Sequence, residues 1–144
     1  MEQKFQNWKN LNPMYYWQFV MKKKADRLPC VVIKGDPTVS VVRLIQQYQN
    51  YPIHWIIEDG QEISEIKNIL YRDSSHLSYH EWVKNWSSVD FLICKESEKD
   101  YWMVALLCGV SVIFDSNIQD LPSIQVLSSV DRIENWEKAK NLLT

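Results

Sequence analysis

The chain has 144 residues, 46% of them hydrophobic and 24% charged, and its 16 basic and 18 acidic residues give a net charge of −2. This composition is typical of one folded domain and excludes an intrinsically disordered chain. A charge near zero provides no broad positive field for phosphate backbones, so we expect no nucleic-acid partner. The apolar runs are shorter than the ~18 residues of a membrane span and the N-terminus is too polar for a signal peptide, so we expect a cytoplasmic protein with no membrane contact.

The N-terminal segment, residues 1–28, includes NPMYYWQFVMKKK over residues 12–24, which predicts a helix packed against the edge of the domain. Because Trp and Tyr are enriched where proteins dock, this segment is also a candidate contact surface for a protein partner. Its crowded aromatic residues are Trp8, Tyr15, Tyr16 and Trp17.

Short continuous apolar runs predict buried strands. They are CVVIKG (30–35), IHWIIED (53–59), DFLICKE (90–96), VSVIFDS (110–116) and, more weakly, IQVLS (124–128). Runs that are apolar on both faces are typical of parallel strands covered by helices on each side. Together with the helical patterns between them, the runs predict a single α/β domain over residues 1–144. We expect a three-layer Rossmann-like fold with a mainly parallel sheet of four or five strands, and no order of the strands is predicted.

Helical patterns follow the first two strands, over residues 37–49 and 61–71. In the first pattern, Asp36 followed by Pro37 is a typical N-cap and first helical residue. In the second, apolar residues recur at helical spacing, which predicts a helix packed on the sheet. These residues are Ile63, Ile66 and Leu70.

Helix-capping signals mark the later helices. Ser78 and Glu81 have the spacing of a capping box, and Ser97 and Asp100 repeat it. Gly109 is well placed to end the helix that Ser97 opens. We therefore predict helices over residues 79–86, 100–108 and, near the C-terminus, 130–143.

Polar residues follow the predicted strands. In an open parallel sheet the carboxyl ends of the strands form the ligand crevice, because the N-termini of the helices converge there. The candidate ligand-binding residues are Lys34, Gly35, Asp36, Asp59, Lys95, Glu96 and Asp115. The same residue types also cap helices and turn chains, so the pattern alone does not separate a site from strand ends. Because Lys34 and Lys95 are the cations of this set, we expect the anionic group of a nucleotide or nucleotide sugar near them.

No complete catalytic or metal motif occurs in the sequence. The chain lacks the glycine-rich loops that hold pyrophosphate, so we expect no cofactor, and whether the protein is an enzyme stays open. His76 and His80 have the spacing of a zinc pair, but a cap at Ser78 would leave His76 outside the helix. One alternative remains, a Mg²⁺ ion held by the strand-end carboxylates Asp36, Glu58, Asp59, Glu96 and Asp115. We expect the three cysteines to be buried thiols that behave as small apolar residues: Cys30, Cys94 and Cys108.

Residues 89–117, VDFLICKESEKDYWMVALLCGVSVIFDSN, resemble the strand–helix–strand of the donor-binding half of GT-B glycosyltransferases. VALLCG stands where that family has a phrase such as EAMACG, and Glu96 falls at the first Glu of its E-x7-E pair. Val104 occupies the second position, where the family's Glu typically holds the ribose of the nucleotide. VVIKGDP is similar to the GDGP turn that opens such a half, with Lys34 in place of a glycine. The resemblance implies a Rossmann-like fold and a relationship to nucleotide-sugar handling.

Two functions of different classes follow. The first is a small Rossmann-like binding domain that is non-catalytic alone or acts with a partner, because a complete GT-B enzyme reacts between two such halves and this chain has the length of one. The alternative is a protein inhibitor, such as the immunity protein of a bacterial toxin, which would use an acidic and aromatic face.

Overall fold

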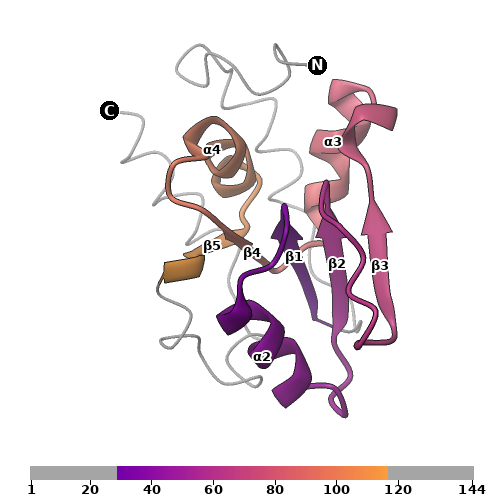
Figure 1. The fold of residues 1–144 in the computed structure, drawn as a ribbon. Coiled ribbons are helices and arrows are strands. Elements are labelled where there is room, and N and C mark those ends of the chain that lie inside the picture. Colours follow the sequence, from indigo (N-terminus) through magenta and orange to yellow (C-terminus); the bar gives the residue numbers. More distant parts are fainter. Residues whose placement is uncertain (1–28, 117–144) are drawn as a thin grey trace.

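The computed structural model of the protein describes residues 29–116 (Figure 1). The predicted helices at 12–24 and 130–143 and the weak strand at 124–128 lie outside these residues, as does the aromatic N-terminal segment. In chain order the elements are β1 (Cys30–Lys34), α2 (Val39–Gln47), β2 (His54–Glu58), β3 (Ile69–Arg72), the short 3₁₀ helix η3 (Ser74–His76), α3 (Tyr79–Asn85), η4 (Trp86–Ser88), β4 (Phe91–Cys94), α4 (Lys99–Leu107) and β5 (Ser111–Phe114).

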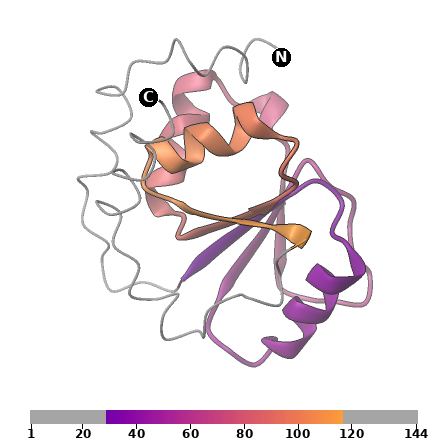
Figure 2. The ribbon, with the colours of Figure 1, turned by 90° about the vertical axis from the view of Figure 1, so that its left-hand side faces the viewer.

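The strands form one five-stranded sheet in the order β3-β2-β1-β4-β5, and every neighbouring pair is parallel. Helix α2 lies on one face of this sheet, and α3 and α4 lie on the other (Figure 2). The predicted three-layer Rossmann-like α/β fold is therefore confirmed, as are the four stronger predicted strands. None of the helices in the described part is long and apolar enough to cross a membrane.

Side chains alternate between the two faces of the central strand β1, as the extended backbone requires. Val31 and Ile33 pack in the core beneath α2, which turns an apolar stripe toward them. Val32 packs in the core on the opposite face, beneath α3 and α4. That second core is rich in aromatic residues, and α4 is buried on all sides, with every residue from Tyr101 to Leu107 buried. Both faces of β1 are thus covered, which explains its continuous apolar sequence.

The helix ends agree only in part with the predicted caps. The Ser78–Glu81 capping box forms as expected, but α4 has Glu98 at its N-cap and no side-chain cap, so the predicted Ser97 cap is wrong. Gly109 ends α4 as predicted, with a φ of 81°. The hydrogen bonds of this ending, from Gly109 N–H to Leu106 and from Val110 N–H to Ala105, form a Schellman motif.

The cap predicted at Asp36 is also wrong. Thr38 is the N-cap of α2, and Pro37 lies before the helix instead of opening it. The Asp36 carboxylate accepts a hydrogen bond from the backbone N–H of Gln61 at 2.7 Å. Asp36 therefore joins the turn after β1 to the turn after β2, and this places it at the carboxyl edge of the sheet.

The helix predicted over 61–71 is wrong. Asn68 adopts a φ of 67°, which breaks any helix at that point, and the residues that follow it form the edge strand β3. Ile66 packs beneath α2, whereas the side chain of Leu70 is 62% exposed. The apolar residues at helical spacing therefore do not share one face.

Candidate functional site

A broad open depression of about 780 Å³ lies at the carboxyl edge of the sheet, over the ends of β1, β2 and β3. The strand order changes direction at β1, with β2 and β3 on one side of it and β4 and β5 on the other. Ligands of open parallel sheets bind beside such a point. The described residues that line the depression are Lys34, Asp36, Asp59, Gly60, Gln61, Tyr71, Arg72, Asp73 and Ser75.

Two tightly packed turns form the floor of this region. Gly35 turns the chain after β1 with a φ of 80°, and its N–H donates to the carbonyl of Glu58 at 2.8 Å. Asp59 takes a φ of 58° at the end of β2, a conformation that Asp tolerates better than most residues. A side chain on Gly60 would place its Cβ 2.3 Å from the carbonyl oxygen of Gly35. The two turns thus touch backbone to backbone, which only glycine allows here.

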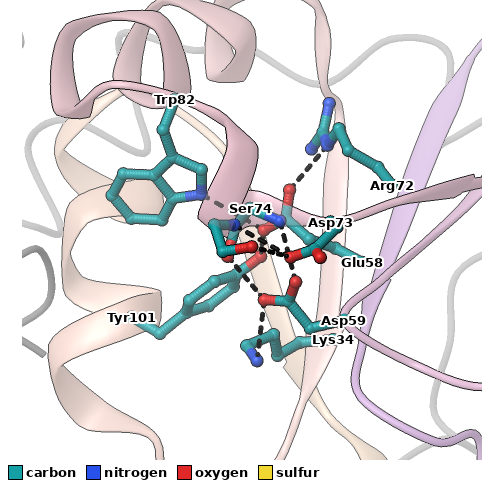
Figure 3. Close-up of polar contacts among 9 residues, drawn as sticks. Lys34, Glu58, Asp59, Arg72, Asp73, Ser74, Trp82 and Tyr101 are labelled. Atoms are coloured by element: carbon teal, nitrogen blue, oxygen red, sulfur yellow. Dashed lines mark hydrogen bonds and ion pairs between the residues drawn. The ribbon is translucent and has the colours of Figure 1, made fainter. Parts of the chain in front are cut away.

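Asp59 is fixed by contacts from two neighbouring elements (Figure 3). Its carboxylate accepts from the backbone N–H of Ser74 at 2.8 Å and from the Ser74 hydroxyl at 2.6 Å. Lys34 Nζ lies 3.2 Å from the same carboxylate and 5.2 Å from the centroid of the Tyr101 ring. Lys34 is therefore held in place by an ion pair and a cation–π contact, with its ammonium group at the rim of the depression.

Glu58 is a fully buried carboxylate, 0% exposed, beneath this layer. Arg72 Nε donates to it at 2.6 Å, Trp82 Nε1 donates at 3.1 Å, and the Tyr101 hydroxyl donates to the same oxygen as Trp82. The contact with Arg72 uses only Nε, and a terminal guanidinium nitrogen points away from Glu58 in Figure 3. Glu58 is thus a structural anion that fixes Arg72, while Arg72 also lines the depression.

Burial and the neighbouring charge of Glu58 raise the pKa of Tyr101 well above its usual value of 10.0. Tyr101 therefore stays protonated and keeps donating to Glu58 over the physiological pH range. Cys94 behaves similarly, because burial raises the pKa of its thiol to about 12. All three cysteines are buried, as predicted.

The high pKa of Tyr101 predicts a loss of stability in alkali. Above pH 10.0 the unfolded tyrosine ionises while the folded one stays protonated, so the unfolded state is favoured. From this residue we expect a loss of about 1 kcal/mol in the free energy of unfolding between pH 10 and about pH 11. The Tyr101→Phe variant has no group that ionises at this position. The difference in free energy of unfolding between wild type and variant should therefore be smaller at pH 11 than at pH 10, by about 1 kcal/mol. Urea unfolding at both pH values measures it, and a constant difference would refute the prediction.

The structure brings part of the predicted site together. Lys34, Asp36 and Asp59 line the depression, and Gly35 forms the turn beneath it. The other three predicted residues follow β4 and β5 and do not line it: Lys95, Glu96 and Asp115.

A smaller hollow of about 220 Å³ lies at the start of α4, and Lys34 borders it as well. It is formed mainly by Ser97–Tyr101. Lys34 therefore stands between the two hollows, at the point where the strand order changes direction.

The carboxylates proposed for Mg²⁺ do not gather into one cluster. Within residues 29–116 no group of three or more His, Cys, Asp or Glu side chains is arranged to hold a metal ion. His76 lies in η3, before the Ser78 cap of α3, while His80 lies within that helix. The two histidines therefore do not share a helical face, as their sequence context predicted.

One side of the depression, which β3 and η3 supply, is not among the residues predicted from the sequence. Tyr71, Arg72, Asp73 and Ser75 line this side, and Tyr71 falls within the helix wrongly predicted over residues 61–71. A signal was present, because the apolar run ILY is followed by RDSS, just as polar residues follow the other strands. Read as a strand end, RDSS would have added these residues to the site.

Comparison with protein-family models, curated proteins and solved structures finds no match to this chain. The positions that carry the resemblance to GT-B glycosyltransferases can be placed directly. Glu96 is exposed just after β4, whereas Val104 is 1% exposed and packs in the core around α4.

Proposed function

We propose that this domain binds a small ligand of the nucleotide or nucleotide-sugar class at the carboxyl edge of its sheet, and that it is non-catalytic alone or acts with a partner. The observation that carries the proposal is the depression beside β1, where the cations Lys34 and Arg72 stand among hydrogen-bonding carboxylates. Its position agrees with the general location of ligands in parallel sheets.

The side chains around the depression suit a ligand with several hydroxyl groups, whose anionic group can reach Lys34 and Arg72 although the lining carries three carboxylates and two cations. Glu58 is neutralised by Arg72 and Asp59 by Lys34, so neither carboxylate stands as an isolated negative charge. Asp36 and Asp73 accept backbone N–H groups and have further lone pairs for ligand hydroxyls. A sugar or ribose can donate to these carboxylates, while a phosphate can approach the cations.

The side chains of the depression support a role in binding. Among the described residues that line it there is no histidine and no cysteine, the side chains that most readily exchange protons or attack substrates near neutral pH. The buried thiol of Cys94, with its raised pKa, is also a poor nucleophile.

A thermal-shift panel of nucleotides and nucleotide sugars, with and without Mg²⁺, tests this proposal. Binding to the folded state raises the melting temperature. Lys34→Ala should weaken the binding of an active ligand about fivefold or more, the ~1 kcal/mol of a charge-assisted contact. Lys67→Ala is the matched control. It removes the same charge from an exposed residue at the amino end of β3, whereas the depression lies at the carboxyl ends of the strands.

The proposal fails if millimolar ligand gives no stabilisation, or if Lys34→Ala binds as well as Lys67→Ala. In that case the protein-inhibitor alternative would become the better hypothesis. The aromatic segment on which it depends lies outside the described residues, and a pull-down from cell extract would test it.

A further inference from the structure

Among the described residues 29–116, no strand pairs with the outer edge of β3. This strand pairs with β2 on one side and is the last strand of the sheet (Figure 1). The Arg72 carbonyl accepts from Asp59 N–H at 2.8 Å, so the backbone groups of Arg72 and Leu70 face β2. By alternation, Ile69 and Tyr71 direct their N–H and C=O groups outward. Within the described residues no strand or loop pairs with them.

The same strand carries a large exposed apolar side chain. Leu70 is 62% exposed, although its register partner Ile56 on β2 is buried in the core. An unpaired strand edge beside an exposed leucine is a template for a further strand. A binding partner at this edge would satisfy the outward backbone groups and cover Leu70 at once.

We propose that β3 pairs with β3 of a second copy of the protein, antiparallel and about a two-fold axis at Leu70. In this register Leu70 faces Leu70 of the second copy, and Ile69 and Tyr71 form hydrogen-bonded pairs across the axis. The arrangement is isologous, so one surface serves both copies, and it joins the two sheets into one.

Charge complementarity supports a second copy as the partner. Exposed Lys67 lies just before β3, and Asp73, whose side chain is 56% exposed, lies just after it. An antiparallel pair brings the basic end of one strand beside the acidic end of the other, at both ends of the interface. A parallel pair would align like charges instead.

Sedimentation-velocity centrifugation over roughly 1–500 μM protein tests the proposal, because a four-residue strand supports only a small interface and hence a weak dimer. We expect a reversible monomer–dimer equilibrium. Leu70→Lys should raise the dimer dissociation constant at least about tenfold, because two like charges then face each other. Val39→Lys is the matched control, since Val39 is 69% exposed on α2 and should leave the dimer unchanged.

A mixture of Leu70→Lys and Leu70→Glu proteins provides the specific test. Each variant alone should be monomeric, and the mixture should form heterodimers, because opposite charges face each other across the axis. Circular dichroism confirms that both variants are folded. A monomeric wild type over the whole concentration range would overturn the proposal. So would wild-type-like dimerisation of Leu70→Lys, or the absence of heterodimers in the mixture.

Discussion

Replacing Arg72 with methionine will lower the free energy of unfolding by about 3–5 kcal/mol, the usual cost of leaving a buried charge without its partner. The cost is large because Glu58 is 0% exposed and Arg72 is the cation that contacts its carboxylate. Trp82 and Tyr101 would still donate to Glu58, but neither neutralises its charge. Urea unfolding of wild type and Arg72→Met measures the effect.

A second substitution separates the buried charge from lost packing. Glu58→Gln in the Arg72→Met background removes the charge but keeps an oxygen that accepts from Trp82 and Tyr101, so it should restore most of the lost stability. Arg43→Met, at an exposed position of α2, is the control and should change stability by less than about 0.5 kcal/mol. If the double variant were no more stable than Arg72→Met, packing and not charge would explain the loss.

Gly60→Ala will have the second-largest effect, a loss of about 2–3 kcal/mol in the free energy of unfolding. The new Cβ would lie 2.3 Å from the Gly35 carbonyl oxygen and 2.7 Å from Ile57 Cγ2, so the two turns must separate. Because these turns form the floor of the depression, ligand binding should be lost as well.

Gly35→Ala separates the steric effect of a new Cβ from the cost of a positive φ. Gly35 has a φ of 80°, yet nothing lies within 4 Å of a Cβ built on it. Only the conformational cost of about 1–2 kcal/mol applies there. Thermal or urea unfolding should therefore rank Gly60→Ala as the more damaging change. The reverse order would show that the turn after β1 and the turn after β2 do not depend on close contact.

The sequence predicts most of the sheet because burial determines the pattern of parallel strands. Strands β1, β2, β4 and β5 are apolar on both faces, and their positions follow directly from that. Strand β3 lies at the edge of the sheet with Leu70 exposed, so its sequence lacks a continuous buried run. The apolar residues Ile63, Ile66 and Leu70 also recur at the spacing of a helix. Strand order depends on contacts between distant residues, and local patterns do not encode it.

Part of the candidate site could be predicted from the sequence for a similar reason. Lys34, Asp36 and Asp59 lie at the ends of strands that the pattern identifies, whereas Arg72 and Asp73 lie at the end of β3, which it does not identify. The role of Glu58 could not be predicted either, because a polar residue at a strand end is expected to be exposed. Its burial follows from α3 and α4, which bring Trp82 and Tyr101 over it.

The most direct test of ligand binding at the carboxyl edge is an amide NMR titration with UDP-glucose and ADP-glucose. We predict shifts for the backbone amides that surround the depression, above all those of Gly35, Gly60 and Ser75. Ile53 and Asn68 precede β2 and β3, at the amino ends of these strands. The chemical shifts of their amides should not change. An unchanged spectrum at millimolar ligand, or shifts as large at Ile53 and Asn68 as around the depression, would contradict the account.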